Sequence, residues 1–313
     1  MRVLVAGATG AIGRQLVPRL VESGHAVVGM TRSPAKADAV RALGAEVAVA
    51  DALDPEQVAA ALATAEPEAV VHQLTSIANT AELRNLDRAF AGTNQLRTRG
   101  TDHLLSAARA AGVRRFVAQS YAPSIYARVG GPVKSEDAPL EQDAPSSARE
   151  TVAAVQYLER AVLDADWTEG IVLRYGGFYG PGTSMAPGAE QLEAIRQRKF
   201  PVVGGGAGVM SFIHVADAAE ATVAALERGR PGVYNVVDDD PAPLRDWLPA
   251  VAEEIGAKPP RRVPRWLGRL FAGEAMAVMT TEARGASNAK IKRELGWAPG
   301  HPSWRGGIGG AAA

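Results

Sequence analysis

The amino-acid sequence predicts an α/β fold built on a doubly wound parallel sheet. Short apolar runs alternate with segments that have the spacing of amphipathic helices, the order typical of parallel strands joined by crossover helices. The 313 residues are enough for one large α/β domain, alone or with a smaller lobe. Strands are expected at Val3–Ala6, Val27–Met30, Glu46–Val49, Ala69–His72, Arg115–Gln119, Ile171–Arg174 and Gly232–Val237. Helices are expected at Pro55–Ala65, Thr101–Ala111, Asp217–Arg228, Pro243–Ile255 and Arg265–Met279.

A glycine-rich turn follows the first strand and opens the first helix. Gly7, Gly10 and Gly13 are three residues apart, and Ile12, Leu16, Val17 and Leu20 then repeat at helical spacing. The first N–H groups of a helix lack backbone partners and carry partial positive charge, so they bind phosphate. Glycines let a diphosphate approach the backbone. This order predicts a dinucleotide site; the alternative is a turn that merely tolerates glycine.

The turn Gly7-Ala8-Thr9-Gly10-Ala11-Ile12-Gly13 resembles the nucleotide-binding turn of the short-chain dehydrogenase/reductase superfamily. Segments 174–182, 212–217 and 295–297 narrow the resemblance to its extended branch, the NAD(P)-dependent epimerase/dehydratase family. It implies a Rossmann-type sheet with a smaller C-terminal substrate lobe. The expected division is residues 1–174 with 212–238 for the dinucleotide-binding domain, and 175–211 with 239–313 for the substrate lobe. The turn residues expected to touch the cofactor are Gly7, Thr9, Gly10, Ala11, Ile12 and Gly13.

The end of the second strand selects the cofactor in such folds. An acidic residue there would bind the adenosine 2′-hydroxyl, whereas an arginine would bind a 2′-phosphate. The sequence reads Met30-Thr31-Arg32-Ser33-Pro34, without an acid. Arg32 is the expected phosphate partner, Ser33 a second donor, and Arg14 a further charge. We therefore expect NADP(H), with NAD(H) less favoured; the alternative is that Arg32 is a solvated loop residue.

The resemblance implies further cofactor contacts after the later strands. Asp51 would touch adenine with its neighbour Ala52, although it could instead cap the helix near Pro55, for which Asp54 is better placed. Thr75 would lie near the ribose, or be an ordinary turn residue. The remaining expected contacts are Gln73, Leu74, Gly177 and Phe178.

The catalytic segment departs from the family pattern. The family carries a Ser after the fifth strand and a Tyr-x-x-x-Lys on the next helix, where the Tyr exchanges a proton and the Lys lowers its pKa. Here Ser120 supplies the Ser, but Tyr157 is followed at the fourth place by Ala161. The sequence therefore makes Ser120 and Tyr121 the catalytic candidates, with Tyr121 and Tyr126 as substitutes for the missing Tyr. The alternative for Tyr121 is a packing role.

Two further departures surround this segment. Arg97 stands where the family has an Asn, three residues before Gly100. Lys134 lies in the loop 128–145, whose prolines, glycines and acids predict a mobile surface flap with a solvated Lys134.

The substrate side lacks an arginine that sugar-nucleotide members typically carry before the position of Ser211. Met210 stands there, and a thioether packs on apolar ligands but cannot pair with phosphate. The expected substrate residues are Tyr126, Met185 and Met210. The favoured hypothesis is an NADP(H)-dependent oxidoreductase acting on a small, fairly apolar carbonyl or enone compound. The alternatives are a sugar-nucleotide epimerase/dehydratase and a non-catalytic NADP(H)-binding redox sensor.

Composition excludes several classes of function. The 34 basic and 34 acidic residues balance, so bulk charge recruits neither nucleic acid nor an anionic membrane. There is no cysteine, hence no disulfide or thiolate chemistry, and the five histidines lack ligand-like spacing, so no metal is expected. No signal peptide or membrane span is expected, so the expected location is the cytoplasm. The oligomeric state is not predicted.

Overall fold

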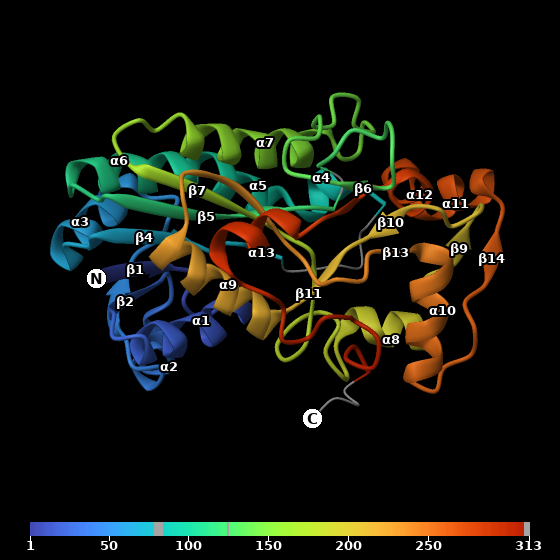
Figure 1. Cartoon of the computed structure of the whole chain (residues 1–313), viewed down its shortest axis with the longest axis horizontal. Coiled ribbons are helices and arrows are strands. Elements are labelled where there is room, and N and C mark those ends of the chain that lie inside the picture. The colour runs from blue at the N-terminus through green and yellow to red at the C-terminus, as the bar shows by residue number, and fades with distance from the viewer. Residues whose placement is uncertain (78–83, 124, 310–313) are drawn as a thin grey trace.

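The computed structural model describes residues 1–77, 84–123 and 125–309, and it has a seven-stranded parallel sheet as its central layer. The strand order is β12-β7-β5-β4-β1-β2-β3 (Figure 1). The chain order reverses between β1 and β4, which places the ends of these two strands at the switch point where α/β sheets bind ligands. The strands are β1 (Arg2–Ala6), β2 (Ala26–Thr31), β3 (Glu46–Val49), β4 (Ala69–His72), β5 (Arg115–Tyr121), β7 (Glu169–Tyr175) and β12 (Gly232–Val236).

Helices cover both faces of this sheet, which confirms the predicted doubly wound α/β fold. Val3 and Val5 pack with one helical layer, whereas Leu4 and Ala6 pack with the other, because successive strand residues point to opposite faces. The first layer contains α1 (Ala11–Glu22), α2 (Ala37–Ala42), α9 (Val215–Arg228) and α13 (Ala289–Leu295). The second contains α3 (Pro55–Ala65), η3 (Leu96–Gly100), α6 (Thr101–Ala110) and α7 (Arg149–Leu163).

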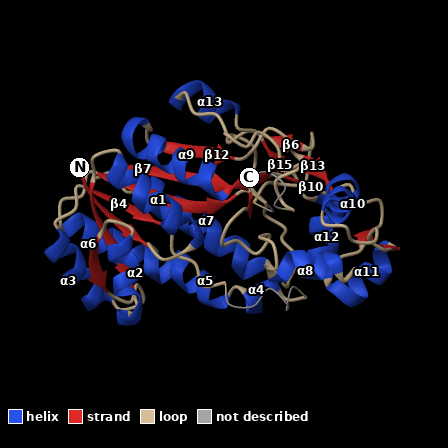
Figure 2. Ribbon diagram, turned by 90° about the horizontal axis from the view of Figure 1, so that it is seen from below, coloured by secondary structure: helices blue, strands red, loops and turns tan. Residues whose placement is uncertain are grey.

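A smaller group of short elements lies at the other end of the molecule (Figure 2). They are β8 (Gly177–Tyr179), α8 (Glu190–Arg196), β9 (Val202–Val203), β10 (Val209–Met210), β11 (Phe212–His214), β13 (Ala242–Pro243), α10 (Leu244–Glu254), β14 (Arg262–Val263), α11 (Arg265–Ala272), α12 (Glu274–Glu282) and β15 (Gly285–Ala286). Their core includes Phe212, Leu248 and Trp304. We retain the two-lobe division as a proposal, with one amendment: Ile291 and Leu295 of α13 pack into the core of the large sheet.

The single helix predicted over Arg265–Met279 is wrong. The segment forms α11 and α12, which meet at Gly273. Gly273 has a φ of +86°, a conformation that other residues adopt only with strain, and a Cβ there would lie 2.6 Å from the Arg84 carbonyl oxygen. The glycine therefore ends one helix and lets the next begin at a new angle.

The predicted mobile flap at 128–145 is also wrong, because this segment is anchored at several points. Its strand β6 (Val133–Lys134) pairs with β15, and Tyr126 forms a bridge with Leu140. Lys134 is buried rather than solvated, and its ammonium group donates to the Val129 carbonyl oxygen. Along the chain, α4 (Leu86–Ala89) and α5 (Ala91–Gln95) precede η3, and η1 (Pro34–Lys36) follows β2.

A buried ion pair joins the sheet to α7. The Arg174 guanidinium on β7 donates to both carboxylate oxygens of Glu159, at 2.8 Å and 2.6 Å, and also to the Tyr126 hydroxyl at 3.1 Å. The Ser120 hydroxyl donates to Glu159 at 2.5 Å, and the Tyr126 hydroxyl donates to Asn235 Oδ1 at 2.5 Å. Both charges are thus satisfied, so the cluster fixes β5, β7, β12 and α7 to one another.

Removing one member of this pair should destabilise the fold strongly. Glu159→Ala would leave a buried guanidinium without its carboxylate, and we expect a loss of about 3–5 kcal/mol in the free energy of unfolding, measured in urea. Asp38→Ala breaks the exposed pair with Arg41 and should cost less than about 1 kcal/mol. Equal losses for the two variants would contradict the role given to the buried pair.

Candidate functional site

The glycine turn presents open backbone donors at the start of α1. The Gly10 N–H donates to the Gly7 carbonyl oxygen at 3.0 Å, and the first helical bond runs from the Arg14 N–H to the Gly10 carbonyl oxygen. No side chain caps this helix, and its first turn contains no acidic residue. The N–H groups of residues 11–13 and the helix dipole therefore fit the diphosphate of a dinucleotide.

The three glycines have different steric roles. Gly7 has a φ of +98°, and a Cβ there would lie 2.7 Å from the Gln73 carbonyl oxygen of the neighbouring strand end. A Cβ on Gly13 would collide with the Gly7 and Ala8 carbonyl oxygens, so Gly13 lets α1 pack on the turn. A Cβ on Gly10 would lie 3.3 Å from the Gly7 carbonyl oxygen, so this position has the most room within the protein. Gly10 is therefore the glycine whose substitution acts on a ligand rather than on the fold.

The residues predicted to select the cofactor follow the same edge of the sheet as the glycine turn. Arg32 is exposed just after β2, and Ser33 follows it. Arg14 is also exposed, and its Nε donates to the Thr9 carbonyl oxygen at 3.0 Å. Asp51 accepts the Leu53 N–H at 3.0 Å. This arrangement leaves the adenine role of Asp51 and Ala52 as a prediction.

The residue that caps α3 is Asp54, as the sequence favoured. The Asp54 carboxylate accepts the N–H groups of Glu56 and Gln57 at 3.0 Å and 3.1 Å. Asp54, rather than Asp51, therefore caps this helix.

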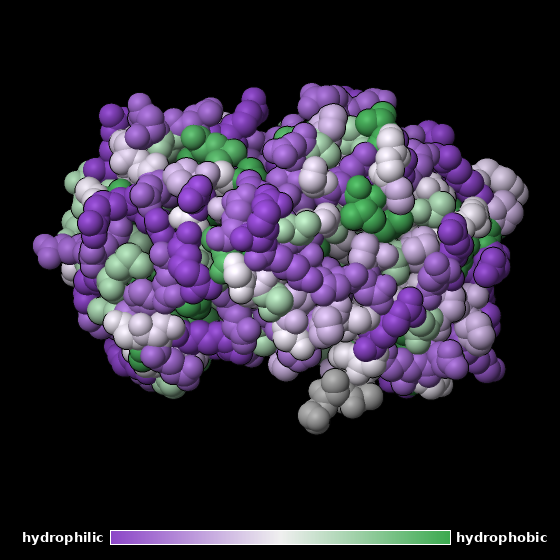
Figure 3. Space-filling model, viewed as in Figure 1, coloured by the Kyte–Doolittle hydropathy of each residue, from purple (hydrophilic) through white to green (hydrophobic). Residues whose placement is uncertain are grey.

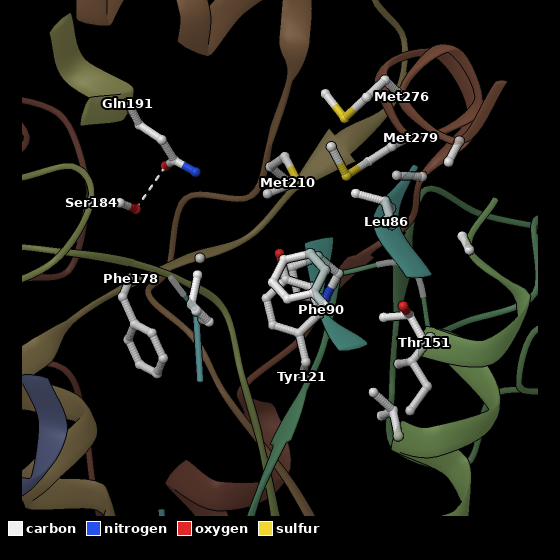
Figure 4. A pocket seen from close by; sticks show the side chains of 18 of the residues that line it. Leu86, Phe90, Tyr121, Thr151, Phe178, Ser184, Gln191, Met210, Met276 and Met279 are labelled. Atoms are coloured by element: carbon white, nitrogen blue, oxygen red, sulfur yellow. Dashed lines mark hydrogen bonds between the residues drawn. The ribbon is translucent and has the colours of Figure 1, made fainter. Parts of the chain in front are cut away.

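A cavity of about 690 Å³ runs from the glycine turn into the smaller group of elements. This volume lies within the roughly 300–1,000 Å³ typical of small-molecule sites. Its apolar walls include Leu86, Phe90 and Phe178 (Figure 4). Four of the six methionines line it: Met185, Met210, Met276 and Met279. A polar pair also lines it, in which the Ser184 hydroxyl donates to Gln191 Oε1 at 2.9 Å.

The cavity brings together many, but not all, of the predicted site residues. Those that line it are Gly10, Ala11, Ile12, Gly13, Gln73, Thr75, Tyr121, Tyr126, Gly177, Phe178, Met185 and Met210. Those that do not are Gly7, Thr9, Arg14, Arg32, Ser33, Asp51, Ala52, Leu74 and Ser120.

Two of the residues predicted to be catalytic or to bind substrate, Ser120 and Tyr126, have hydroxyl groups that form hydrogen bonds within the protein. Ser120 is buried and its hydroxyl binds Glu159, on the α7 side of β5, so the structure does not support a catalytic role for it. The Tyr126 ring reaches the cavity wall, but its hydroxyl is held between Arg174 and Asn235. Neither hydroxyl is therefore free to exchange a proton with a ligand.

Tyr121 points into the cavity and is the remaining candidate acid (Figure 4). Burial raises the pKa of its phenol, and the nearby Arg97 guanidinium opposes that rise. Tyr157 lies elsewhere: it is on the exposed side of α7, and its hydroxyl donates to Asp102 at 2.8 Å. Tyr157 therefore has no access to the cavity.

Arg97 is a pocket residue that the sequence did not identify as functional. It lies in the π-helical turn η3, and its side chain is only 8% exposed. Its neighbour His72 has a pKa lowered to about 4 by burial, so that imidazole is neutral near pH 7. His72 Nδ1 accepts the Leu74 N–H at 3.2 Å, which leaves the proton on Nε2, facing the Thr101 hydroxyl. In the sequence, the one indication that Arg97 has a special role was that it replaces the Asn of the family pattern.

One cluster of possible metal ligands exists among the described residues: His214, Asp217 and His301. Some of their hydrogen-bonding atoms already have protein partners: Asp217 accepts the His301 N–H at 2.8 Å, and His214 Nδ1 accepts the Ala216 N–H at 3.3 Å. His214 thus caps α9, which is a structural role.

The outer surface is mixed in character. The face in Figure 3 is mostly hydrophilic, with separate apolar patches. Within the described part of the chain, no helix combines the length and apolar character needed to cross a bilayer.

Comparison with known proteins identifies relatives over the whole chain. The model of the NAD dependent epimerase/dehydratase family matches residues 3–236. A "3-diazoavenalumate denitrifying reductase" from a Streptomyces species is 50% identical, covering 99% of both chains. A Stigmatella aurantiaca "4-hydroxy-2-methyl-3-oxo-4-farnesyl-3,4-dihydroquinoline-1-oxide ketoreductase" is 31% identical, over 82% of this chain and 74% of its own. A Thermus thermophilus UDP-glucose 4-epimerase solved with NAD has a TM-score of 0.72 and 26% identity, covering 99% of this chain and 97% of its own.

Substitutions at two glycines should separate ligand binding from folding. Gly10→Val places a branched side chain where the diphosphate approaches, so we expect loss of dinucleotide binding with the unfolding midpoint little changed. Gly13→Val, by contrast, forces a clash between α1 and the turn and should lower the midpoint itself. Fluorescence titration and thermal unfolding measure the two effects. Normal dinucleotide binding by Gly10→Val would mean that the turn has a structural role only.

Proposed function

This chain belongs to the NAD dependent epimerase/dehydratase family, and on that premise we propose that it is an NADPH-dependent reductase of a small, largely apolar compound. Its reductase and epimerase relatives make it an NAD(P)-dependent oxidoreductase-type enzyme. The observation that carries the finer proposal is the cavity, whose apolar walls continue directly from the glycine turn. When bound, NADPH would supply a hydride, with its diphosphate held by the N-terminus of α1.

Arg32 supports NADPH over NADH. It is exposed at the carboxyl end of β2, and the segment after this strand contains no acidic residue before Asp38. An arginine here favours a 2′-phosphate, whereas an acid would favour a free ribose hydroxyl.

The chemical group that accepts the hydride determines whether this chain must also supply a proton. A carbonyl or enone that gains a hydride becomes an alkoxide or enolate and needs a proton. Tyr121 is the group in the cavity that could give it, because the raised pKa of its half-buried phenol keeps the proton on the hydroxyl near pH 7. The ketoreductase among the relatives favours this class of substrate.

A diazo substrate has different needs, and the reductase that is 50% identical to this chain favours it. A diazonium group that gains a hydride can lose N₂, with the C–N bond breaking and the hydrogen ending on carbon. Both electrons of the hydride enter the new C–H bond, and the positive charge is neutralised without an added proton. Such a reaction needs no Tyr-x-x-x-Lys pair, which is the motif that this chain lacks. The missing pair is therefore compatible with an active enzyme.

The cofactor preference can be tested at Arg32. Arg32→Ala should weaken NADPH binding roughly ten- to hundredfold, because a charge-assisted hydrogen bond contributes about 1.5–3 kcal/mol. NADH binding should change little, and Lys36→Ala, at an exposed position of the same loop, should leave both affinities unchanged. Titrations with both dinucleotides measure this. Tighter NADH than NADPH binding by the unmutated protein would contradict the proposal.

The role of Tyr121 separates the two substrate classes. With carbonyl substrates, Tyr121→Phe should lower turnover about 10²–10⁴-fold, the usual contribution of a positioned acid. With an aryl diazonium substrate, the same variant should turn over at nearly the original rate. Tyr157→Phe, outside the cavity, is the matched control and should change neither. A wild-type protein that binds NADPH but reduces neither class would favour the redox-sensor alternative.

A further inference from the structure

Arg97 is a buried cation for which the described residues provide no hydrogen-bonding or ion-pair partner. Its side chain is 8% exposed and lines the cavity, where it contributes a guanidinium among largely apolar walls. Among the described residues, no hydrogen bond or ion pair satisfies this guanidinium. Arg174, buried to a similar degree, makes contacts to Glu159, Tyr126 and the Glu136 carbonyl oxygen. Within the described part of the chain, Arg97 therefore has no counterpart to the carboxylate that holds Arg174.

The groups around Arg97 do not neutralise it. His72 is neutral near pH 7, because burial lowers its pKa to about 4, and the half-buried Tyr121 phenol, whose pKa is raised, keeps its proton. Two carboxylates also line the cavity. Glu141 is paired with Arg128 at 2.8 Å, and Glu190 is exposed and forms no ion pair with Arg97. Burial lowers the pKa of Arg97 to about 10, which still leaves it charged near neutral pH.

A largely buried charge without a counter-ion is costly, and an anionic ligand group bound beside it in the cavity would reduce that cost. The π-helical turn that carries Arg97 is a local widening of the kind often found at functional sites. The diphosphate of the cofactor has its own donors at the start of α1. The anion at Arg97 is therefore expected to belong to the other ligand.

We propose that Arg97 binds a carboxylate of the substrate, so that the natural substrate is an apolar organic acid held by its charged end beside Tyr121. This inference rests on the proposed function, since it assigns the ligand of the same cavity. A guanidinium suits the task, because its planar fork matches a carboxylate with two parallel hydrogen bonds. The apolar walls would then cover the rest of the molecule.

Binding of simple acids and their amides tests the proposal without relying on turnover. The probes are 4-hydroxycinnamate and octanoate, each paired with its neutral amide, titrated by calorimetry into protein saturated with NADP⁺. Wild type should bind at least one acid more tightly than its amide. Arg97→Met should weaken that acid about ten- to hundredfold and leave the amide within about threefold. Arg97→Lys should fall between the two, because it keeps the charge but not the fork.

Arg99→Met is the matched control, because Arg99 lies on the same turn but is exposed, and it should leave every affinity unchanged. NADPH affinity, measured separately, should be the same in wild type and Arg97→Met; failure of wild type to bind NADPH would instead count against the proposed function. In urea, Arg97→Met should not lower the unfolding midpoint, since it removes an uncompensated charge. Three results would overturn the inference: no acid preferred over its amide by wild type, a lowered midpoint, or a loss of NADPH affinity without a loss of acid affinity.

Discussion

The Arg174–Glu159 ion pair is the interaction on which the geometry of this site depends. It draws α7 against the sheet and recruits the hydroxyl groups of Ser120 and Tyr126 as its ligands. Successive residues of a strand face opposite ways, so once Ser120 on β5 points toward α7, Tyr121 must point away from it. That orientation delivers the Tyr121 phenol to the cavity. One electrostatic cluster thus determines which hydroxyl is structural and which can meet a ligand.

Arg174 and Arg97 are both buried, but they differ in whether the protein supplies partners for the charge. Arg174 is surrounded by acceptors, and its burial is a property of the folded chain alone. Arg97 has comparable exposure, and among the described residues the titratable groups that interact with it are the His72 imidazole and the Tyr121 phenol. The contacts of Arg174 stabilise the fold. Arg97, by contrast, can gain a counter-ion when an anionic ligand binds. Counting buried charges without counting their partners would treat the two residues as equivalent.

Local sequence patterns predicted the sheet and the glycine turn before α1 because both depend on short-range features. The strands Glu46–Val49 and Ala69–His72 and the helix Pro55–Ala65 were predicted to the residue, since apolar runs and an Asp-Pro start signal define them. The packing of β6 on β15 joins segments about 150 residues apart, which no local pattern reveals. The same is true of Ser120, whose role depends on Glu159 approaching from another element. The burial of Arg97 runs against the usual exposure of arginine, and only the departure from the family's Asn hinted at it.

The methionine-lined wall has a consequence for the breadth of ligands that this cavity can accept. Unbranched thioether side chains change shape readily, so a wall built from Met210, Met276 and Met279 can adjust to bodies of different length and curvature without moving the backbone. Selectivity for the apolar body of a ligand is then expected to be shallow. Discrimination would fall on the rigid features, which are the reacting group near the nicotinamide and the opposite, polar terminus. The same protein could thus accept compounds that differ in their apolar middle part, provided that they keep the same reacting group and the same polar terminus.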